Sequence, residues 1–162
     1  MIAVFQRVTS ASVAVDGELV GQCGAGCLIL LGVARGDTEL DADRLAAKLA
    51  KLRVFADNNG KMNRSVTDIG GCALVVPNFT LLADYTHGNR PDYLGAAPPD
   101  EANALYEYFC RALEEQSVPV SRGIFGADMR VSLVNDGPVT LVLDSRSLGT
   151  GIHPANIYQV NN

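Results

Sequence analysis

The chain has 162 residues, of which 48% are hydrophobic and 19% charged, and its net charge is −5. This length suits one domain whose core needs neither disulfides nor metals, and the composition excludes a disordered chain. The four cysteines lack C-x-x-C spacing and the chain has only two histidines, so we expect reduced thiols, no metal and no cofactor. No signal peptide or bilayer-spanning apolar run is evident, which predicts a cytoplasmic protein without a membrane partner.

The charge also limits the kind of nucleic-acid partner that we expect. A protein that follows a phosphate backbone normally presents a basic face, because the release of counterions drives binding. Here 13 basic residues stand against 18 acidic ones, and no Lys/Arg cluster is evident along the chain. We therefore expect no DNA partner, and any contact with RNA should be small and end-on.

The N-terminal third has the pattern of strands joined by tight turns. Ile2, Val4 and Gln6 alternate with the residues of the opposite face, and Asp16-Gly17 is a strong hairpin signal. The Gly24-Ala25-Gly26 segment is expected to be a turn before a buried apolar strand. The predicted strands cover residues 2–7, 12–15, 19–21 and 27–33.

Two helices are expected, each with one buried face. In the first, Asp37 or Thr38 caps the N-terminus, and Leu45, Leu49 and Leu52 recur at helical spacing. The second begins at Pro98-Pro99-Asp100; its core-facing residues are Ala102, Leu105, Phe109 and Leu113.

The order of the remaining elements predicts the fold class. We expect strands over 72–76, 129–134 and 139–143, a further strand within 118–124, and a loop over 77–93. This order is typical of a single α/β domain of layered mixed or antiparallel sheets with two helices on one face. The other face must be covered by a second sheet or by another subunit, so dimerisation is plausible. Residues 1–145 form the predicted domain, and 146–162 form a loose polar tail.

The sequence carries none of the common catalytic or nucleotide-binding motifs. His87 could act as a general base, but in a polar loop a solvated histidine is the better interpretation. Asp84 and Asp92 could form a carboxylate pair, although loop-capping acids are the stronger reading.

Two segments are the stronger candidates for a functional site. Pro77-Asn78-Phe79-Thr80-Leu81 follows an apolar strand, and backbone N–H groups at such a strand end can hold a developing oxyanion. Thr80 as a nucleophile is a weaker reading, since no base neighbours it in sequence. The Gly137-Pro138 bond lies in an expected turn between two strands and is a candidate cis peptide. Taken alone, the two segments read as a strand-to-loop transition and a plain turn.

Several collinear blocks together resemble the D-aminoacyl-tRNA (D-tyrosyl-tRNA) deacylase family. They are MIAVFQRVTSASV at the start, GKMN at 60–63, ALYEYF at 104–109, FGADM at 125–129 and VSLVNDGPVT at 131–140. The resemblance implies a homodimeric hydrolase with that family's fold, which removes D-amino acids, and glycine mischarged on tRNA, from the tRNA 3′ end in translation quality control.

The resemblance also assigns site residues, at the interface between two subunits. Gly137 and Pro138, joined by a cis bond, reach into the partner's pocket and leave no room for an L-side chain, so chirality is judged by exclusion. Arg7 holds this motif. Phe79 and Thr80 form the pocket wall, where backbone amides face the scissile ester and no side chain is essential. Asn78 belongs to the same family signature, and Met129 lies near the terminal adenosine. The tRNA's own 2′-hydroxyl helps to activate water.

One position departs from the family pattern and keeps two alternatives open. Pro77-Asn78 replaces the family's Ser-Gln, which removes an N–H and a hydroxyl and shortens a side chain. A related animal group with proline there accepts some L-aminoacyl-tRNAs, although the Asn135–Thr140 segment here has the D-specific form. The alternatives are a deacylase of relaxed specificity and a catalytically degenerate module that only binds the tRNA end.

Overall fold

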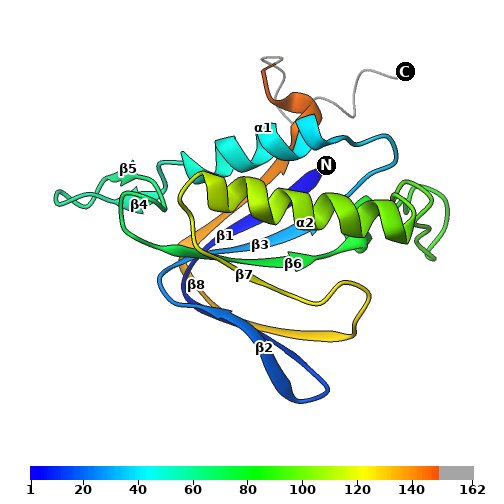
Figure 1. The fold of residues 1–162 in the computed structure, drawn as a ribbon, viewed down its shortest axis with the longest axis horizontal. Coiled ribbons are helices and arrows are strands. Elements are labelled where there is room, and N and C mark those ends of the chain that lie inside the picture. The colour runs from blue at the N-terminus through cyan, green and yellow to red at the C-terminus, as the bar shows by residue number, and fades with distance from the viewer. Residues whose placement is uncertain (150–162) are drawn as a thin grey trace.

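The computed structural model describes residues 1–149 and shows two helices packed on one face of a strongly bent sheet (Figure 1). The helices are α1 (Glu39–Ala50) and α2 (Pro99–Glu115). The sheet contains β1 (Ile2–Val15), β2 (Glu18–Cys23), β3 (Gly26–Gly32), β6 (Cys72–Pro77), β7 (Val120–Arg122) and β8 (Met129–Asp144). A separate small hairpin is formed by β4 (Phe55–Ala56) and β5 (Met62–Arg64). The predicted single α/β domain with two helices is confirmed.

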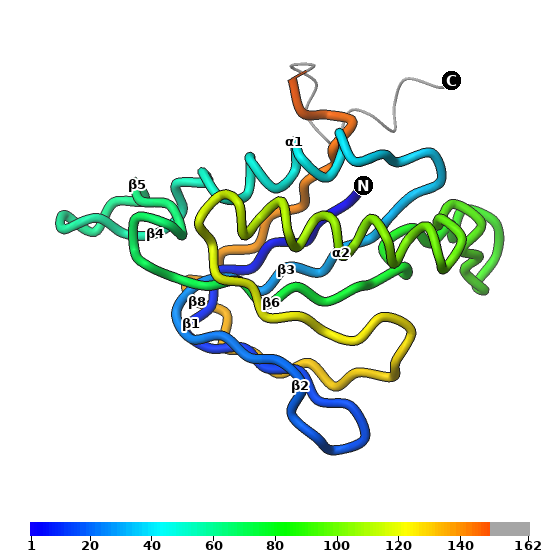
Figure 2. The backbone as a smooth tube through the Cα atoms, viewed as in Figure 1, coloured from blue at the N-terminus to red at the C-terminus, as the bar shows by residue number. Residues whose placement is uncertain are grey.

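The long strand β1 organises the sheet. Along one edge it pairs first with β3 and then with β2, and along the other edge it pairs with β8 over its whole length. The bend lies where the β1–β8 register shifts, between Gln6 and Ser10 (Figure 2). The bend brings β2 back toward β7. The two strands come so close that a Cβ on Gly21 would lie 2.6 Å from the Arg122 carbonyl oxygen. The sheet is therefore nearly closed into a barrel.

Two predicted pairs of strands are wrong in the same way. The segments 2–7 and 12–15 are parts of one strand, and so are 129–134 and 139–143. The Asn135–Thr140 segment is consequently an irregular part of β8 and not a turn that joins two strands. β1 and β8 remain continuous because they pair with each other through the bend. Such long-range pairing cannot be predicted from local sequence patterns.

The core has two parts, one on each side of the sheet. Between sheet and helices, Phe5, Ile29 and Leu31 pack against Leu49 and Phe109, and all five side chains are buried. Inside the barrel-like half, a smaller cluster consists of Val8, Ala11, Val13, Cys23, Leu28, Leu74 and Val76. The predicted buried faces of both helices are confirmed with two exceptions: Leu105 is only partly buried, and Leu52, also partly buried, lies beyond the end of α1.

The helix ends resolve the capping alternatives. Thr38 is the N-cap of α1. The Thr38 N–H (2.9 Å) and the Thr38 hydroxyl (3.0 Å) both donate hydrogen bonds to the Asp41 carboxylate. Asp37 instead accepts a hydrogen bond from the Ala34 N–H and contacts the N-terminal amine. Pro99 occupies the first position of α2, as predicted.

Some local structure was not predicted. The β4–β5 hairpin encloses a turn at Asn58-Asn59-Gly60, and a 3₁₀ helix, η1 (Phe79–Leu82), lies in the expected loop 77–93. Ser145–Ser147 form a second 3₁₀ helix, η2, and the buried Ser145 hydroxyl donates to Asp41 at 2.9 Å. Arg146 and Ser147, the first residues of the predicted tail, thus lie in regular structure, and residues 150–162 lie outside the described part. No helix among residues 1–149 is long and apolar enough to cross a membrane.

Candidate active site

A cavity of about 540 Å³ opens where β3 and β6 end beside the start of β8. Parallel pairing brings the carboxyl ends of β3 and β6 to the same edge, and Leu31 lies opposite Pro77 there. The cavity is lined by Gln6, Leu28, Leu30, Val76, Pro77, Asn78, Phe79, Thr80, Gly126, Ala127, Asp128, Met129, Val131 and Leu133. It is thus a mainly apolar pocket with a few polar groups, within the usual size range of small-ligand sites.

The chain leaves the sheet at Pro77 without losing its anchorage. Proline has no N–H, but the N–H of the next residue, Asn78, donates to the Leu31 carbonyl at 2.8 Å. The departure from the family's Ser-Gln pattern therefore leaves the Leu31 oxygen paired, and the segment after Pro77 starts from a defined position.

Asn78 then shapes the pocket wall by capping η1. Its Oδ1 accepts a hydrogen bond from the Thr80 N–H (3.2 Å) and another from the Thr80 hydroxyl. The Thr80 N–H is thus already used. The Phe79 N–H has no hydrogen-bond partner among the described residues, as is usual for a donor in the first turn of a helix. A free N–H in the pocket wall is a group that can stabilise negative charge on a bound carbonyl oxygen.

Two lining residues of the pocket, Phe79 and Met129, are in contact with residues just outside it. The Phe79 side chain is 56% exposed and forms an edge-to-face pair with Tyr93, with ring centroids 5.0 Å apart. Gly123 packs so closely here that a Cβ on it would lie 2.9 Å from the Met129 sulfur and 3.2 Å from Pro77 Cδ. Met129 is thereby held against the end of β6.

The Gly137-Pro138 segment lies elsewhere, on the exposed side of the bend in β8. The bond is cis, both residues are exposed, and Gly137 has φ +117°. The Asn135 amide donates to the carbonyls of Arg7 (2.9 Å) and Val139 (3.1 Å) and so closes this segment from within.

Arg7 supports the same segment from β1. Its Nε lies 3.1 Å from the Asp136 carbonyl oxygen and 3.0 Å from an Asp136 carboxylate oxygen. Its Nη1 donates to the carbonyl of Val54, just before β4. The guanidinium therefore links Asp136 to the base of the β4–β5 hairpin.

The predicted site residues thus fall into two groups within one chain. Asn78, Phe79, Thr80 and Met129 line the pocket, whereas Arg7, Gly137 and Pro138 do not. Gln6 connects the two groups, because it lines the pocket and its side-chain amide nitrogen lies 3.5 Å from the hydroxyl oxygen of Thr140 on β8. Sequence reasoning did not select Gln6, although a polar residue on the Ile2–Val4 face was a usable signal.

A family model described as D-Tyr-tRNA(Tyr) deacylase matches residues 4–144. This chain belongs to that family. A protein of Ruegeria pomeroyi named D-aminoacyl-tRNA deacylase is 59% identical over 144 residues, which cover 89% of this chain and 99% of the relative. Another of that name, from Anaeromyxobacter dehalogenans, is 57% identical over 148 residues, covering 91% and 99%.

Solved structures show the same deacylase fold. The structure titled c-Myc DNA Unwinding Element Binding Protein has a TM-score of 0.83 at 40% identity, covering 89% of this chain and 98% of its own. One titled as a probable eukaryotic D-amino acid tRNA deacylase has a TM-score of 0.73 at 17% identity, covering 88% and 98%. The second likeness concerns the fold alone. The division into a 1–145 deacylase domain and a 146–162 tail stays a prediction.

The other candidates from the sequence take no part in this pocket. Asp84 and Asp92 pair through their backbones, while their carboxylates accept hydrogen bonds from Thr86 and Leu94 respectively. The Thr86 N–H and hydroxyl lower the pKa of Asp84. The reading as loop-capping acids is confirmed. His87 is exposed and does not line the pocket.

The cysteines do not provide a nucleophile either. Burial raises the pKa of Cys23 and that of Cys110 to about 12, and none of the four thiols lines the pocket. At neutral pH these two groups remain thiols, which are poor nucleophiles. Among residues 1–149 no group of three or more His, Cys, Asp and Glu side chains is arranged to hold a metal ion.

Proposed function

We propose that this chain hydrolyses the ester of D-aminoacyl-tRNA, and of glycine mischarged on tRNA, and spares L-aminoacyl-tRNA. Membership in the family supports the enzyme class, because relatives with this name match over nearly their whole length. The chain is an enzyme of the deacylase class, a hydrolase of ester bonds. The observation that carries the substrate proposal is the single pocket that contains Asn78, Phe79, Thr80 and Met129.

The pocket suits a reaction that relies on backbone groups. Water adds to the ester carbonyl, and the oxyanion that forms accepts a hydrogen bond from the free Phe79 N–H. The C–O bond to the ribose then breaks, the ribose oxygen takes up a proton, and the free amino acid leaves. We propose that the tRNA's 2′-hydroxyl helps to activate the water; the pocket offers no histidine or cysteine, and Asp128 is the one carboxylate in its lining.

Selection against L-residues is proposed to come from a second subunit. Gly137 and Pro138 are exposed and lie outside this chain's own pocket, so they are free to enter a partner's pocket and exclude an L-side chain there. Val134 and Val142, on the same strand, are 57% and 59% exposed, and such apolar surface is typical of an interface. Light scattering should therefore give twice the mass of one 17.2 kDa chain.

Hydrolysis of D-Tyr-tRNA, L-Tyr-tRNA and Gly-tRNA by the purified protein tests the proposal. Cleavage of the D and Gly esters alone is the expected result. Cleavage of the L ester as well would favour the relaxed deacylase. If a folded protein cleaves none, the enzyme proposal fails and the tRNA-end binding module remains; recovered activity in Pro77→Ser/Asn78→Gln would assign the loss to that pair.

Thr80 should be dispensable as a nucleophile. Its hydroxyl already donates to Asn78 Oδ1, so we expect Thr80→Val to keep kcat for D-Tyr-tRNA within about tenfold of the parent, since its N–H keeps the cap. Asn78→Ala is the matched comparison and should lose more, because it releases both hydrogen bonds from Thr80 that hold the start of η1. A loss of more than about 1,000-fold in single-turnover assays of Thr80→Val would instead identify a nucleophile.

A further inference from the structure

The acidic net charge of the chain conceals a local basic surface. Residues 48–64, which we call the basic arm, run from the last turn of α1 through the β4–β5 hairpin. Their only acidic residue is Asp57. The basic residues of the arm are Lys48, Lys51, Arg53, Lys61 and Arg64. The arm therefore has a positive charge within a chain whose net charge is −5.

Only part of this charge is offset within the chain: Arg64 and Arg53 add to the Ser65 hydrogen bonds that lower the pKa of Asp68. In the part of the chain that the structure describes, no ion pair involves a residue of the arm. Arg53 donates to the neutral Asn63, and Arg64 donates to a backbone carbonyl, that of Asp68. The Asp57 carboxylate accepts from the backbone N–H groups of Asn59 and Lys61.

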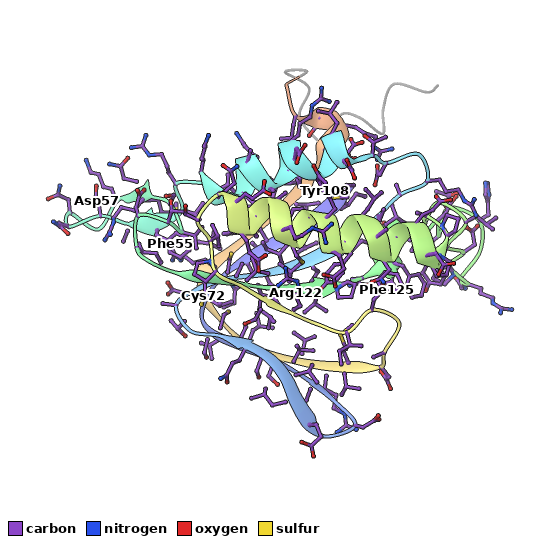
Figure 3. All side chains as sticks on the ribbon, viewed as in Figure 1. Phe55, Asp57, Cys72, Tyr108, Arg122 and Phe125 are labelled. Carbon is purple, nitrogen blue, oxygen red and sulfur yellow. The ribbon has the colours of Figure 1, made fainter. Side chains whose placement is uncertain are left out.

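Two lysines of the arm have no structural role that would explain them. Lys51 and Lys61 are exposed, and neither ammonium group makes a hydrogen bond to a described residue. Lys48 is different, because a cation in the last turn of α1 stabilises the helix dipole. Figure 3 shows Asp57 far out on the projecting hairpin and Phe55 nearer its base, so the arm extends into solvent.

The position of the arm relates it to the Gly137-Pro138 segment. Arg7 donates to the Val54 carbonyl at the base of the arm and to the Asp136 carbonyl beside Gly137. Figure 1 shows the hairpin at one end of the molecule, whereas the segment that follows β6, which includes the pocket wall, lies at the other. The arm is thus remote from its own pocket and adjacent to the segment proposed to enter the partner's pocket.

We infer that the basic arm binds backbone phosphates of the tRNA whose aminoacylated end lies in the partner subunit's pocket. This inference rests on the proposed function and its dimer. Lysine ammonium groups bind phosphates without reading sequence, so this contact does not depend on which tRNA is bound. The arm also explains how a protein of net charge −5 binds a polyanion. The basic arm attracts the RNA phosphates, and the acidic rest of the protein does not contact the RNA.

The salt dependence of hydrolysis tests the arm. In Lys51→Gln/Lys61→Gln, the log–log slope of kcat/KM for D-Tyr-tRNA against salt should flatten by about 1.5, because two phosphate contacts are lost. Between about 50 and 200 mM salt, this removes a roughly tenfold part of the parent's decline. Hydrolysis of 3′-O-(D-tyrosyl)adenosine, which lacks phosphates, should be unchanged.

Arg44→Gln/Arg111→Gln is the matched control, since it changes the net charge equally at two exposed helix positions outside the arm. Its slope should equal that of the parent. Equal slopes for the arm variant and the parent would overturn the inference, and so would a parallel loss on the adenosine ester. A parent that cleaves neither substrate would refute the proposed function itself.

Mixed dimers test which pocket the arm serves. One subunit carries the arm substitutions and an intact pocket, and the other carries an intact arm and Ala127→Trp, which fills the pocket. With two different affinity tags the mixed dimer can be purified, and only the first subunit's pocket is active. The parental salt slope is expected, because the second subunit supplies the arm; the flattened slope would place the arm at its own pocket and overturn the inference.

Discussion

Gly137→Ala is expected to lower kcat/KM for D-Tyr-tRNA by about 100-fold or more while the protein remains folded. The residue has φ +117°, which L-residues rarely adopt, and an added Cβ would lie 2.6 Å from Arg7 Nη2 and 3.0 Å from Val139 Cγ2. Arg7 cannot simply move away, because its guanidinium is held by Asp136 and by the Val54 carbonyl. The segment must shift instead, and a displacement of about 1 Å in a positioning element can cost about 100-fold in rate.

Gly36→Ala separates this effect from backbone strain. Gly36 also has a positive φ, +81°, but a Cβ there would meet nothing within 4 Å. It should lose about 1 kcal/mol of stability and retain full activity. Single-turnover hydrolysis and thermal unfolding of both variants make the comparison. Parental rates and parental D/L discrimination in Gly137→Ala would show that this segment does not select the substrate.

The largest expected effect on stability is that of Gly26→Ala. Gly26 is the first residue of β3 and pairs with Val8 on one side and Cys72 on the other. A Cβ would lie 1.9 Å from the Cys72 carbonyl oxygen and 2.8 Å from the Cys72 nitrogen. Both are backbone atoms of a neighbouring strand, so the overlap can be relieved only by separating β3 from β6. We expect a loss of about 4 kcal/mol or more in the free energy of unfolding, a size reserved for disrupted cores.

Gly24→Ala is a control two residues away. Nothing lies within 4 Å of a Cβ at Gly24, and the change should alter stability by less than about 0.5 kcal/mol. Urea unfolding of both proteins, followed by circular dichroism, gives the two free energies. Similar values would mean that β3 and β6 can move apart easily, contrary to the close pairing seen here.

These glycines also show where local patterns stop being informative. Gly24, Ala25 and Gly26 read equally as turn residues, yet Gly26 belongs to a central strand and Gly24 does not. The difference is the approach of Cys72, 46 positions later in the chain. Likewise, the charge pattern of residues 48–64 gains a meaning only when the fold places it beside Asp136.

The sequence alone determined the helices, most of the strands and the family resemblance, because each depends on short-range periodicity or on contiguous motifs. The resemblance in turn named four residues that line the pocket, Asn78, Phe79, Thr80 and Met129. The tertiary structure decided how these parts meet. It joined 2–7 with 12–15 into β1, brought Gln6 and Met129 to the segment after Pro77, and kept Gly137 and Pro138 out of the same pocket. Strand pairing across more than 110 residues produces these arrangements. The free energy of such pairing comes from packing and hydrogen bonds between distant segments, which no local pattern encodes.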